Sequence, residues 1–314
     1  LSNMLPDITA NRVPKIQIIP KLDGYVSFES KGRELLGWNT SLSSPRPFFY
    51  PLIGPSGKSI TRMGHPAAAD HSHHRSFWWG HNNIAGVNFW EETKNIGNKP
   101  QIRQDHWLHF QDGDTEASMA VQLGWYDSHN VKLIQQDLIV LIKPLSNNEL
   151  WLEIQTRFTP IPVELKIPKT NFGFLGLRVA KTISARFGNG ILSSSTGEIT
   201  EKNIFAKPAK WMDYSGPMDD KNDEGVTWFD HSLNPRYPVS WHVRDDGWIS
   251  PAFCLRDEYL LEKTKPLELR YGLHIHAEKL NSENANKHFD SFASSGKLVL
   301  EKTQGTYPFV IKRV

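Results

Sequence analysis

Residues 70–81, DHSHHRSFWWGH, hold the side chains of this chain that are best suited to chemistry: four of its thirteen histidines, one arginine and two tryptophans. Histidine gains or loses a proton near neutral pH, and a neighbouring positive charge can stabilise an anion formed during a reaction. The stretch therefore predicts an acid–base site. We expect His74 or His81 to act as the catalytic base or acid, and Arg75 to contact a negatively charged oxygen.

The same stretch has some features of a metal site. His71 and His73 would share one face of an extended segment, and this spacing suits zinc or iron if a third ligand comes from elsewhere. The chain has no His-Glu-x-x-His motif, however, and no carboxylate follows these histidines at short spacing. We predict no cofactor and keep a bound metal ion as an alternative.

A sugar-binding wall is the third interpretation of this stretch. The chain has eleven tryptophans, and several of them lie beside polar residues in the sequence. An indole ring can stack on the apolar face of a sugar while polar side chains bind the hydroxyl groups. The substrate contacts predicted from this part of the chain are Arg62, His71, His73, Arg75 and the stacking ring of Trp79.

A second polar cluster occupies residues 228–248, WFDHSLNPRYPVSWHVRDDGW. We predict His231 as a further catalytic residue for proton transfer. The residues expected to bind substrate here and in the preceding stretches GFLGLRVAK and KWMDYSG are Arg178, Trp211, Asp230, Asn234 and His242. The chain has no Gly-x-Ser-x-Gly elbow and no glycine-rich phosphate loop, so neither a serine-triad hydrolase nor a nucleotide-binding protein is predicted.

Alternating apolar and polar residues dominate the elements that must position these side chains. In residues 267–278, LELRYGLHIHAE, apolar residues alternate with His274, His276 and other polar residues, as in a strand with one buried and one solvated face. Strands are also predicted over 15–20, 24–30, 118–125, 131–142, 148–158 and 296–302. The pattern is typical of an all-β protein, a large antiparallel β-sandwich with long loops and few helices.

Only residues 282–295, SENANKHFDSFASS, predict a helix. Residues 166–230 are rich in glycine, proline, asparagine and serine, and we interpret them as long loops over one face of the sandwich. Neither a linker nor a shift in composition divides the chain. We therefore expect a single domain over residues 1–314, with two smaller β-domains as the alternative.

Composition narrows the classes of partner. The 36 basic and 34 acidic side chains give a net charge of +2 without a basic block, so no nucleic-acid partner is predicted. No apolar run approaches the roughly 18 residues that span a bilayer, so no membrane span is predicted. Cys254, the only cysteine, lies in an apolar run and is expected to be buried. The sequence leaves the oligomeric state open.

The succession RPFFYPL, GPSG, DHSHHRSFWWGH, GVNFW, GLRVAK, WMDYSG and GVTWFDHSLNPRYPVSWHVRDDG resembles a bacterial family of unknown function commonly labelled methane oxygenase PmoA-like. The resemblance spans Arg46 to about Tyr271 and implies a galactose-mutarotase-like supersandwich, a fold whose members act on sugars. It does not imply methane oxidation, because the membrane subunit of that label spans the bilayer several times. Together with the expected sugar substrate, the resemblance implies a periplasmic or secreted protein.

The sequence therefore predicts a carbohydrate-active protein whose partner is a small-molecule sugar or oligosaccharide. We expect an enzyme that performs acid–base chemistry on a sugar or oxidised sugar, as a lyase, epimerase or hydrolase. The histidine and late glutamate of mutarotases are not found at matching positions, so plain mutarotation is not predicted. The alternatives are a non-catalytic carbohydrate-binding protein and, third, a histidine-ligated metalloenzyme.

Overall fold

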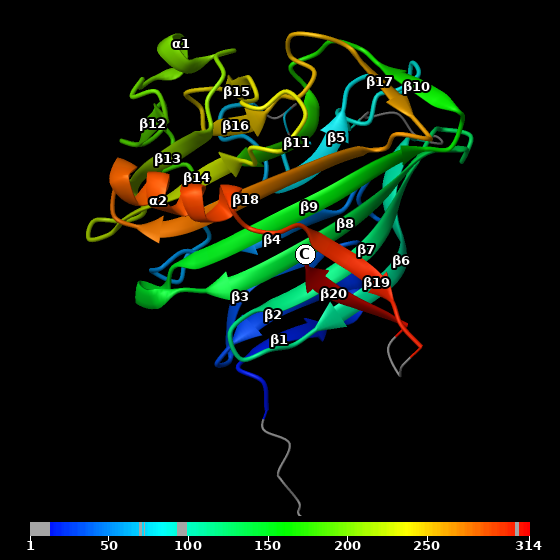
Figure 1. The fold of residues 1–314 in the computed structure, drawn as a ribbon. Helices are drawn as coiled ribbons and strands as arrows, with labels where there is room; N and C mark the ends of the chain where they lie inside the picture. Colours follow the sequence, from blue (N-terminus) through cyan, green and yellow to red (C-terminus); the bar gives the residue numbers. More distant parts are fainter. Residues whose placement is uncertain (1–12, 69–70, 72, 93–98, 305–307) are drawn as a thin grey trace, which may run out of the picture.

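The computed structural model describes residues 13–68, 71, 73–92, 99–304 and 308–314 (Figure 1). In this part of the chain most regular structure is antiparallel strand, arranged as two sheets of eight strands each. Each sheet contains strands from both halves of the chain, and the two sheets share one hydrophobic core. This arrangement confirms the all-β antiparallel sandwich that the alternating pattern predicts.

The two sheets interleave along the sequence. The spatial order of the first sheet is β1 (Ile16–Pro20), β2 (Tyr25–Ser30), β3 (Arg33–Asn39), β4 (Phe48–Leu52), β5 (Phe77–His81), β11 (Gly173–Arg178), β16 (Trp248–Pro251) and β15 (Trp241–Val243). The order of the second sheet is β12 (Ile191–Ser194), β13 (Trp211–Pro217), β14 (Asp223–Asp230), β18 (Leu267–Ala277), β9 (Leu150–Pro160), β8 (Lys132–Pro144), β7 (Ala117–Tyr126) and β6 (Gln101–Gln111).

Smaller elements complete the described structure. Two short strand pairs are β10 (Glu164–Ile167) with β17 (Tyr259–Glu262), and β19 (Leu298–Lys302) with β20 (Phe309–Arg313). The helical segments are η1 (Leu22–Gly24), η3 (Ser146–Asn148), α1 (Glu201–Ile204) and α2 (Ser282–Ala293). None of the helices in the described residues is long and apolar enough to cross a membrane.

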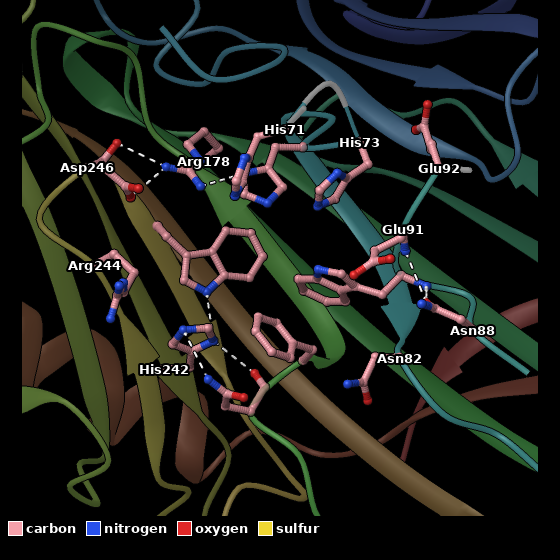
Figure 2. Close-up of a pocket in the computed structure, with 15 residues that line it drawn as sticks. His71, His73, Asn82, Asn88, Glu91, Glu92, Arg178, His242, Arg244 and Asp246 are labelled. Atoms are coloured by element: carbon pink, nitrogen blue, oxygen red, sulfur yellow. Dashed lines mark hydrogen bonds and ion pairs between the residues drawn. The ribbon is translucent and has the colours of Figure 1, made fainter. Parts of the chain in front are cut away.

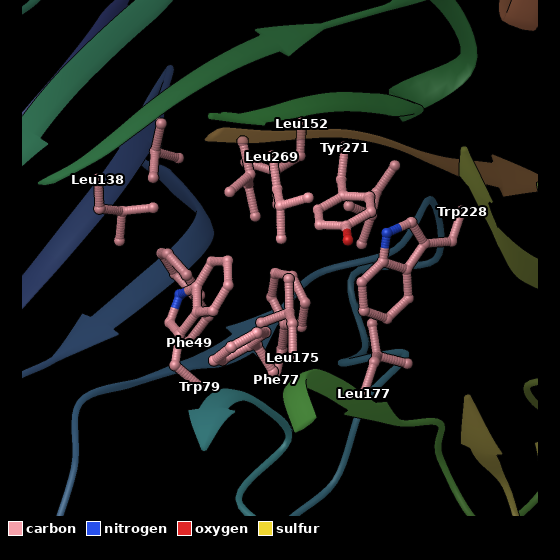
Figure 3. Close-up of a cluster of buried hydrophobic side chains, with 14 of the residues drawn as sticks. Phe49, Phe77, Trp79, Leu138, Leu152, Leu175, Leu177, Trp228, Leu269 and Tyr271 are labelled. Carbon is pink, nitrogen blue, oxygen red and sulfur yellow. The ribbon is translucent and has the colours of Figure 1, made fainter. Parts of the chain in front are cut away.

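The core lies between the sheets and contains the inward half of each alternating strand (Figure 3). The first sheet contributes Phe49, Phe77, Trp79, Leu175 and Leu177, and the second contributes Leu138, Leu152, Trp228, Leu269 and Tyr271. Burial of each such side chain contributes about 1.5–3 kcal/mol to folding. Because core residues occur from Ile16 to Ile275, segments that are distant in the sequence stabilise each other.

The outer face of the second sheet is covered, which corrects the expectation of a half-solvated strand at 267–278. Arg270, His274 and His276 of β18 point away from the core, yet they are only 5–6% exposed. Helix α2 covers this end of the sheet, and Phe289 and Phe292 of the helix pack in one cluster with β13 and β14. The alternation identified the two faces correctly, but it carried no information on what covers the outer one.

The predicted helix is confirmed within two residues of its C-terminal end. Helix α2 covers Ser282–Ala293, and Asn281 rather than Ser282 is its N-cap. The side-chain oxygen of Asn281 accepts a hydrogen bond from the backbone N–H of Asn284 at 3.0 Å. Such a cap satisfies one of the free backbone donors of the first helical turn.

The prediction that residues 166–230 form long loops is wrong. This segment contains strands β11, β12, β13 and β14 as well as helix α1. All six residues of β11 are buried, as are most of β13 and β14, because both faces of these strands are covered. A strand covered on both faces has no reason to alternate apolar and polar residues, and the sequence therefore gave no strand signal here.

Candidate functional site

A pocket of about 580 Å³ lies on the outer face of the first sheet, at β5, β11, β16 and β15 (Figure 2). This volume is in the range of small-molecule sites. We call it the histidine pocket. Its lining combines aromatic, basic, amide and acidic side chains: Trp90, Phe172, Trp248, His71, His73, His74, His242, Arg178, Arg244, Asn82, Asn88, Asn171, Glu91, Glu92 and Asp246.

Strand pairing sets the floor of the pocket. Arg178 of β11 and Trp248 of β16 lie directly opposite each other, so their side chains share one face of the sheet. Their neighbours Leu177 and Ile249 belong to the core, so this face is the outer one. His242 of β15 likewise follows a core tryptophan and precedes a core valine.

Gly176 leaves the space that the Trp248 ring occupies. A Cβ atom at residue 176 would lie 1.7 Å from the Trp248 ring. The Trp248 ring lies 5.0 Å from that of Trp78, and the imidazole of His74 stacks near both indoles, at 5.5 and 5.4 Å. The glycine in β11 therefore permits a continuous aromatic floor over the strand.

A chain of charged groups lies behind this floor. Arg178 is 1% exposed, and its Nη1 donates to Oδ1 of Asp246 at 2.6 Å. The other Asp246 oxygen lies 3.0 Å from Nε2 of His65. Burial would raise the pKa of Asp246, but the Arg178 charge outweighs it and the net pKa is lowered. The aspartate and arginine therefore form a fixed, oppositely charged pair.

The hydrogen bond from Arg178 sets the tautomer of His74. Nη2 of Arg178 contacts Nδ1 of His74, and a guanidinium can only donate. Nδ1 must therefore be unprotonated, which places the ring proton on Nε2. Burial, followed by the Arg178 charge, lowers the pKa of His74 far below its usual range. His74 is thus neutral, and among the hydrogen bonds of the described residues its Nε2–H has no acceptor.

His242 has the opposite arrangement. Its Nδ1 lies 2.9 Å from the carbonyl oxygen of Asn171, which can only accept, so Nδ1 carries the proton. The indole N–H of Trp248 also lies 3.2 Å from Nδ1, but the shorter carbonyl contact decides the tautomer. Nε2 is then unprotonated, and the amide nitrogen of Asn171 can donate a long hydrogen bond of 3.5 Å to it. Burial lowers the pKa of His242 to about 4.

The opposite wall carries acidic side chains (Figure 2). Glu92 accepts hydrogen bonds from Nε and Nη2 of Arg75 at 2.5 and 2.8 Å, and it also lies 3.4 Å from buried Arg46. Burial alone would raise the pKa of Glu92, but the hydrogen bond and charge of Arg75 outweigh it and lower the pKa. Glu91 and Asn88 lie beside it on the same wall.

The described residues contain no group of three or more His, Cys, Asp or Glu side chains arranged to hold a metal ion. The rings of His71, His73 and His74 do lie together, at 4.4–5.5 Å from one another. However, His74 uses Nδ1 for Arg178. Asp70, at the start of the motif, lies outside the described residues.

Residues 25–290, which include the whole histidine pocket, match a family of unknown function, DUF6807. The chain belongs to this family. The family description assigns no activity, and no curated protein matches the chain significantly. The geometry of the pocket is therefore the basis for a functional proposal.

Solved structures resemble this DUF6807 chain only distantly. A human-microbiome protein provisionally described as a kojibiose phosphorylase is 10% identical, over 90% of this chain but 36% of its own, with a TM-score of 0.33. A GalM/aldose epimerase homologue from C. elegans is 8% identical over 85% of this chain and 100% of its own, at 0.33. A TPR-domain protein from Parabacteroides distasonis is 8% identical over 95% and 58%, at 0.32. Scores this low carry no argument.

Five of the predicted site residues meet in the histidine pocket: His71, His73, His74, Arg178 and His242. They come from a loop and two strands that are up to about 170 residues apart in the sequence. Strand pairing between β11, β16 and β15 brings Arg178 and His242 to the same end of the sheet. Their functional roles remain predictions.

Two predicted arginines lie behind the lining. Arg75 forms the ion pair with Glu92 and so positions an acidic side chain of the wall. Arg62 donates to the backbone carbonyls of Gly64 and Asp246. Both arginines therefore hold residues or loops of the pocket, and neither is part of its lining.

His81 and Trp79 lie outside the pocket. Both follow Phe77 at alternate positions of β5 and are buried, and Trp79 packs against Phe158 in the core. Nδ1 of His81 accepts a hydrogen bond from the backbone of Asn83 at 3.1 Å. Burial lowers the pKa of His81 to about 4. Alternation along β5 turns these two rings inward, so they do not share the face that a single polar wall across the motif would require.

The cluster around His231 forms a separate unit beneath α2. Its members are buried, and none lines the histidine pocket: Trp211, Asp230, His231 and Asn234. Trp211 donates to Asn286 of the helix at 3.0 Å. Asp230 accepts hydrogen bonds from Asn234 at 2.7 Å and the backbone of Val239 at 2.8 Å, which fixes the turn after β14. Trp211, predicted to bind substrate, therefore has no contact with the histidine pocket.

Sequence reasoning did not select several pocket residues. Asn171 and Phe172 are single residues in a short loop, with no motif around them. Asp246 directly follows Arg244 and Asp245 in the RDDGW stretch, which was identified as polar. No sequence signal indicated that its partner would be Arg178.

A second polar pocket of about 680 Å³ lies beside α2, and we call it the α2 pocket. His274 and His276 of β18 line it, and these are the histidines expected to face solvent. Nε2 of His274 lies 2.9 Å from Glu149, and Nε2 of His276 lies 2.9 Å from buried Asp213. The His-x-His spacing in LHIHAE was the available signal for this cluster.

Proposed function

We propose that this chain binds a sugar or oxidised sugar in the histidine pocket and carries out acid–base chemistry on it. The observation that carries the proposal is the presence, in one pocket with an aromatic floor, of two neutral histidines fixed in opposite tautomers. His74 offers an N–H donor, and His242 offers an unprotonated nitrogen.

The lining supports a sugar as ligand. A sugar presents C–H faces that stack on aromatic rings and hydroxyl groups that both donate and accept hydrogen bonds. Phe172 is 37% exposed at the pocket, beside the Trp90 ring at 5.6 Å. Asn82, Asn88 and Asn171 supply amides that can bind hydroxyl groups of either polarity.

The two tautomers favour an enzyme over a purely binding protein. Affinity for hydroxyl groups needs donors and acceptors but does not need buried imidazoles. An enzyme that moves a proton needs a base held in one tautomer by a second group, as the Asn171 carbonyl holds His242. In this proposal His242 takes the proton-transfer role, for which the sequence predicts His74 or His81, with His231 as a further candidate.

The proposal places sugar chemistry, rather than methane oxidation, in this family member. We also propose a periplasmic or secreted location, on the basis of the family resemblance and the expected sugar substrate. Fractionation of the source cells checks the location, and recovery of the protein in the cytoplasm would contradict it.

The sugar proposal is tested with two matched variants. Phe172→Ser removes the exposed pocket ring, and Phe110→Ser removes a ring that is 48% exposed on β6 of the other sheet. Saturation-transfer NMR against a panel of mono- and disaccharides should detect binding to the native protein and to Phe110→Ser. Phe172→Ser should bind about tenfold more weakly. Equal binding by both variants, or no binding by the native protein, would contradict the proposal.

A further inference from the structure

We infer that the histidine pocket takes a sugar with a free carbonyl group and moves a proton at the carbon next to that carbonyl. This inference rests on the proposed function and specifies its substrate class and reaction. It rests on the two imidazoles beside Trp248. His74 offers an N–H donor, His242 offers an unprotonated nitrogen, and a hydrogen-bond partner fixes each tautomer.

His74 can stabilise a negative oxygen but cannot act as an acid. Its single proton is on Nε2, and loss of that proton would leave an imidazolate. Nδ1 cannot accept a proton in exchange, because Arg178 occupies it. A neutral imidazole donor of this kind suits a carbonyl oxygen, which becomes negatively charged when a proton leaves the adjacent carbon. The buried Arg178 charge behind the ring strengthens the donor.

His242 can accept the proton. Its Nε2 is unprotonated, and the Asn171 carbonyl at 2.9 Å holds the Nδ1–H and would stabilise the ring once it becomes positively charged. With a pKa of about 4, its basicity is comparable to that of a carboxylate. Arg244 lines the same side of the pocket (Figure 2).

The Trp248 ring brings the two histidines to one ligand. The His74 ring is 5.5 Å from it at an interplanar angle of 26°, and the His242 ring is 5.9 Å from it at 64°. Trp248 is only 2% exposed, so its ring holds the two imidazoles at one pocket, and a sugar in that pocket could contact both of them. Gly176 beneath the ring leaves the space that this position of the indole requires.

The proposed step is balanced without a further reactant. The C–H bond next to the carbonyl breaks, and its proton goes to Nε2 of His242. The electron pair forms a C=C bond, and the C=O pair moves onto the oxygen, which accepts the hydrogen bond from His74. Return of the proton to the same carbon restores the sugar or gives its epimer. Alternatively, the enediol hydroxyl proton moves to the enolate oxygen, and His242 protonates the former carbonyl carbon to give the isomer.

Cleavage of a glycosidic bond would need an acid for the leaving group. Glu92 and Asp246 are held as carboxylates by Arg75 and Arg178, and loss of the single proton of His74 would leave an imidazolate. Glu91 is the remaining carboxyl group of the lining. Proton transfer between carbons needs only the base and the oxygen-stabilising donor that the pocket shows.

The experiment follows solvent deuterium by ¹H NMR. The native protein in D₂O is mixed with D-glucose, D-fructose, D-xylose, D-xylulose or methyl 3-keto-glucopyranoside. Sorbitol, xylitol and methyl glucopyranoside are the matched compounds without a free carbonyl. We expect deuterium to enter next to the carbonyl in at least one probe, and we expect that probe to bind at least tenfold more tightly than its matched alcohol.

Variants separate the two roles. His242→Gln should lower the exchange rate by about 10²–10⁴-fold. His74→Phe should lower it by about 10²–10³-fold, and His74→Gln, which retains an N–H donor, should recover part of the loss. Phe110→Ser is the control, and a circular dichroism spectrum confirms that each variant is folded.

The outcomes distinguish this inference from the proposed function. If no sugar binds, both fall together. If sugars bind but the reduced compounds bind equally well, or if no probe exchanges deuterium, the sugar pocket stands and the carbonyl chemistry is overturned. Exchange that survives His242→Gln at the native rate also overturns it.

Discussion

At the scale of single residues, hydrogen-bond partners decide what each histidine can do. His74, His81, His231 and His242 are all buried, and burial lowers the pKa of each below its usual range. They differ in their partners and surroundings. His74 faces a donor, His242 faces a carbonyl acceptor, and His81 and His231 each have a buried Nε2 without a partner in the described residues.

The pH dependence of turnover follows from His242. Its pKa of about 4 means that it is unprotonated, and able to act as a base, at all higher pH values. We expect kcat/KM to be flat from about pH 5 to 8 and to fall tenfold for each further pH unit below about 4. A pH–rate profile on the responding sugar measures this. A fall centred near pH 6.5 would indicate a different, more exposed base.

Arg178 should be important for stability as well as for the tautomer. Arg178→Met removes the partner of Asp246 and leaves a carboxylate in a largely buried site. Removal of one member of a buried pair costs about 3–5 kcal/mol, and the partial exposure of Asp246 places the expected loss near the lower figure. Urea unfolding measures it, and a loss below about 1 kcal/mol would show that the pair is not coupled.

At the scale of elements, the site depends on strand formation and strand pairing, and the sequence predicts these only in part. Predicted strands match β1, β2, β7, β8, β9, β18 and β19, because each alternates apolar and polar residues. Strands β5, β11, β15 and β16, which carry the pocket, are short and buried on both faces. Residue types identified His74, Arg178 and His242, but only the pairing of these strands could show that they meet.

Gly176→Ala tests the element beneath the pocket. The added methyl group must displace the Trp248 ring, so we expect a loss of about 1–3 kcal/mol and weaker sugar binding. Gly57→Ala is the control, because residue 57 has a positive φ of 87° and lies away from the pocket. The control should lose stability through strain but keep its affinity. Unfolding and binding titrations on both variants measure the difference.

The contacts of His276 in the α2 pocket predict that the free energy of unfolding depends on pH. Burial alone would lower the pKa of His276, but the charge and hydrogen bond of Asp213 raise it overall. The stabilisation is therefore fully present below the unfolded value of about 6.5, and it is lost as the pH rises through the folded pKa. Glu149 and His274 also lie in this cluster. The contribution of His276 is therefore measured as a difference between the native protein and a variant.

Asp213→Asn isolates that contribution. The free energy of unfolding of the native protein should fall from about pH 6 to 9 by more than that of the variant. Equal slopes for the two proteins would show that His276 is not charged in the folded state.

At the scale of the whole molecule, the sandwich is held by one core shared between its sheets. Leu152 of β9 and Leu177 of β11 are fully buried and lie in this core from opposite sides (Figure 3). Replacement of either by alanine should cost about 2–5 kcal/mol, with both changes shifting one common transition. Thermal unfolding followed by tryptophan fluorescence measures this. Two separate transitions would show that the sheets unfold independently.

The most direct test of the central claim is an NMR titration of the protein with its histidines labelled with ¹⁵N. Addition of a binding sugar should produce saturable shifts at Nε2 of His74 and Nε2 of His242, with His81 and His231 unchanged. Free His74 should show its proton on Nε2, and free His242 should show its proton on Nδ1. Shifts at His231 instead, or sugar binding with both pocket histidines unmoved, would contradict the account.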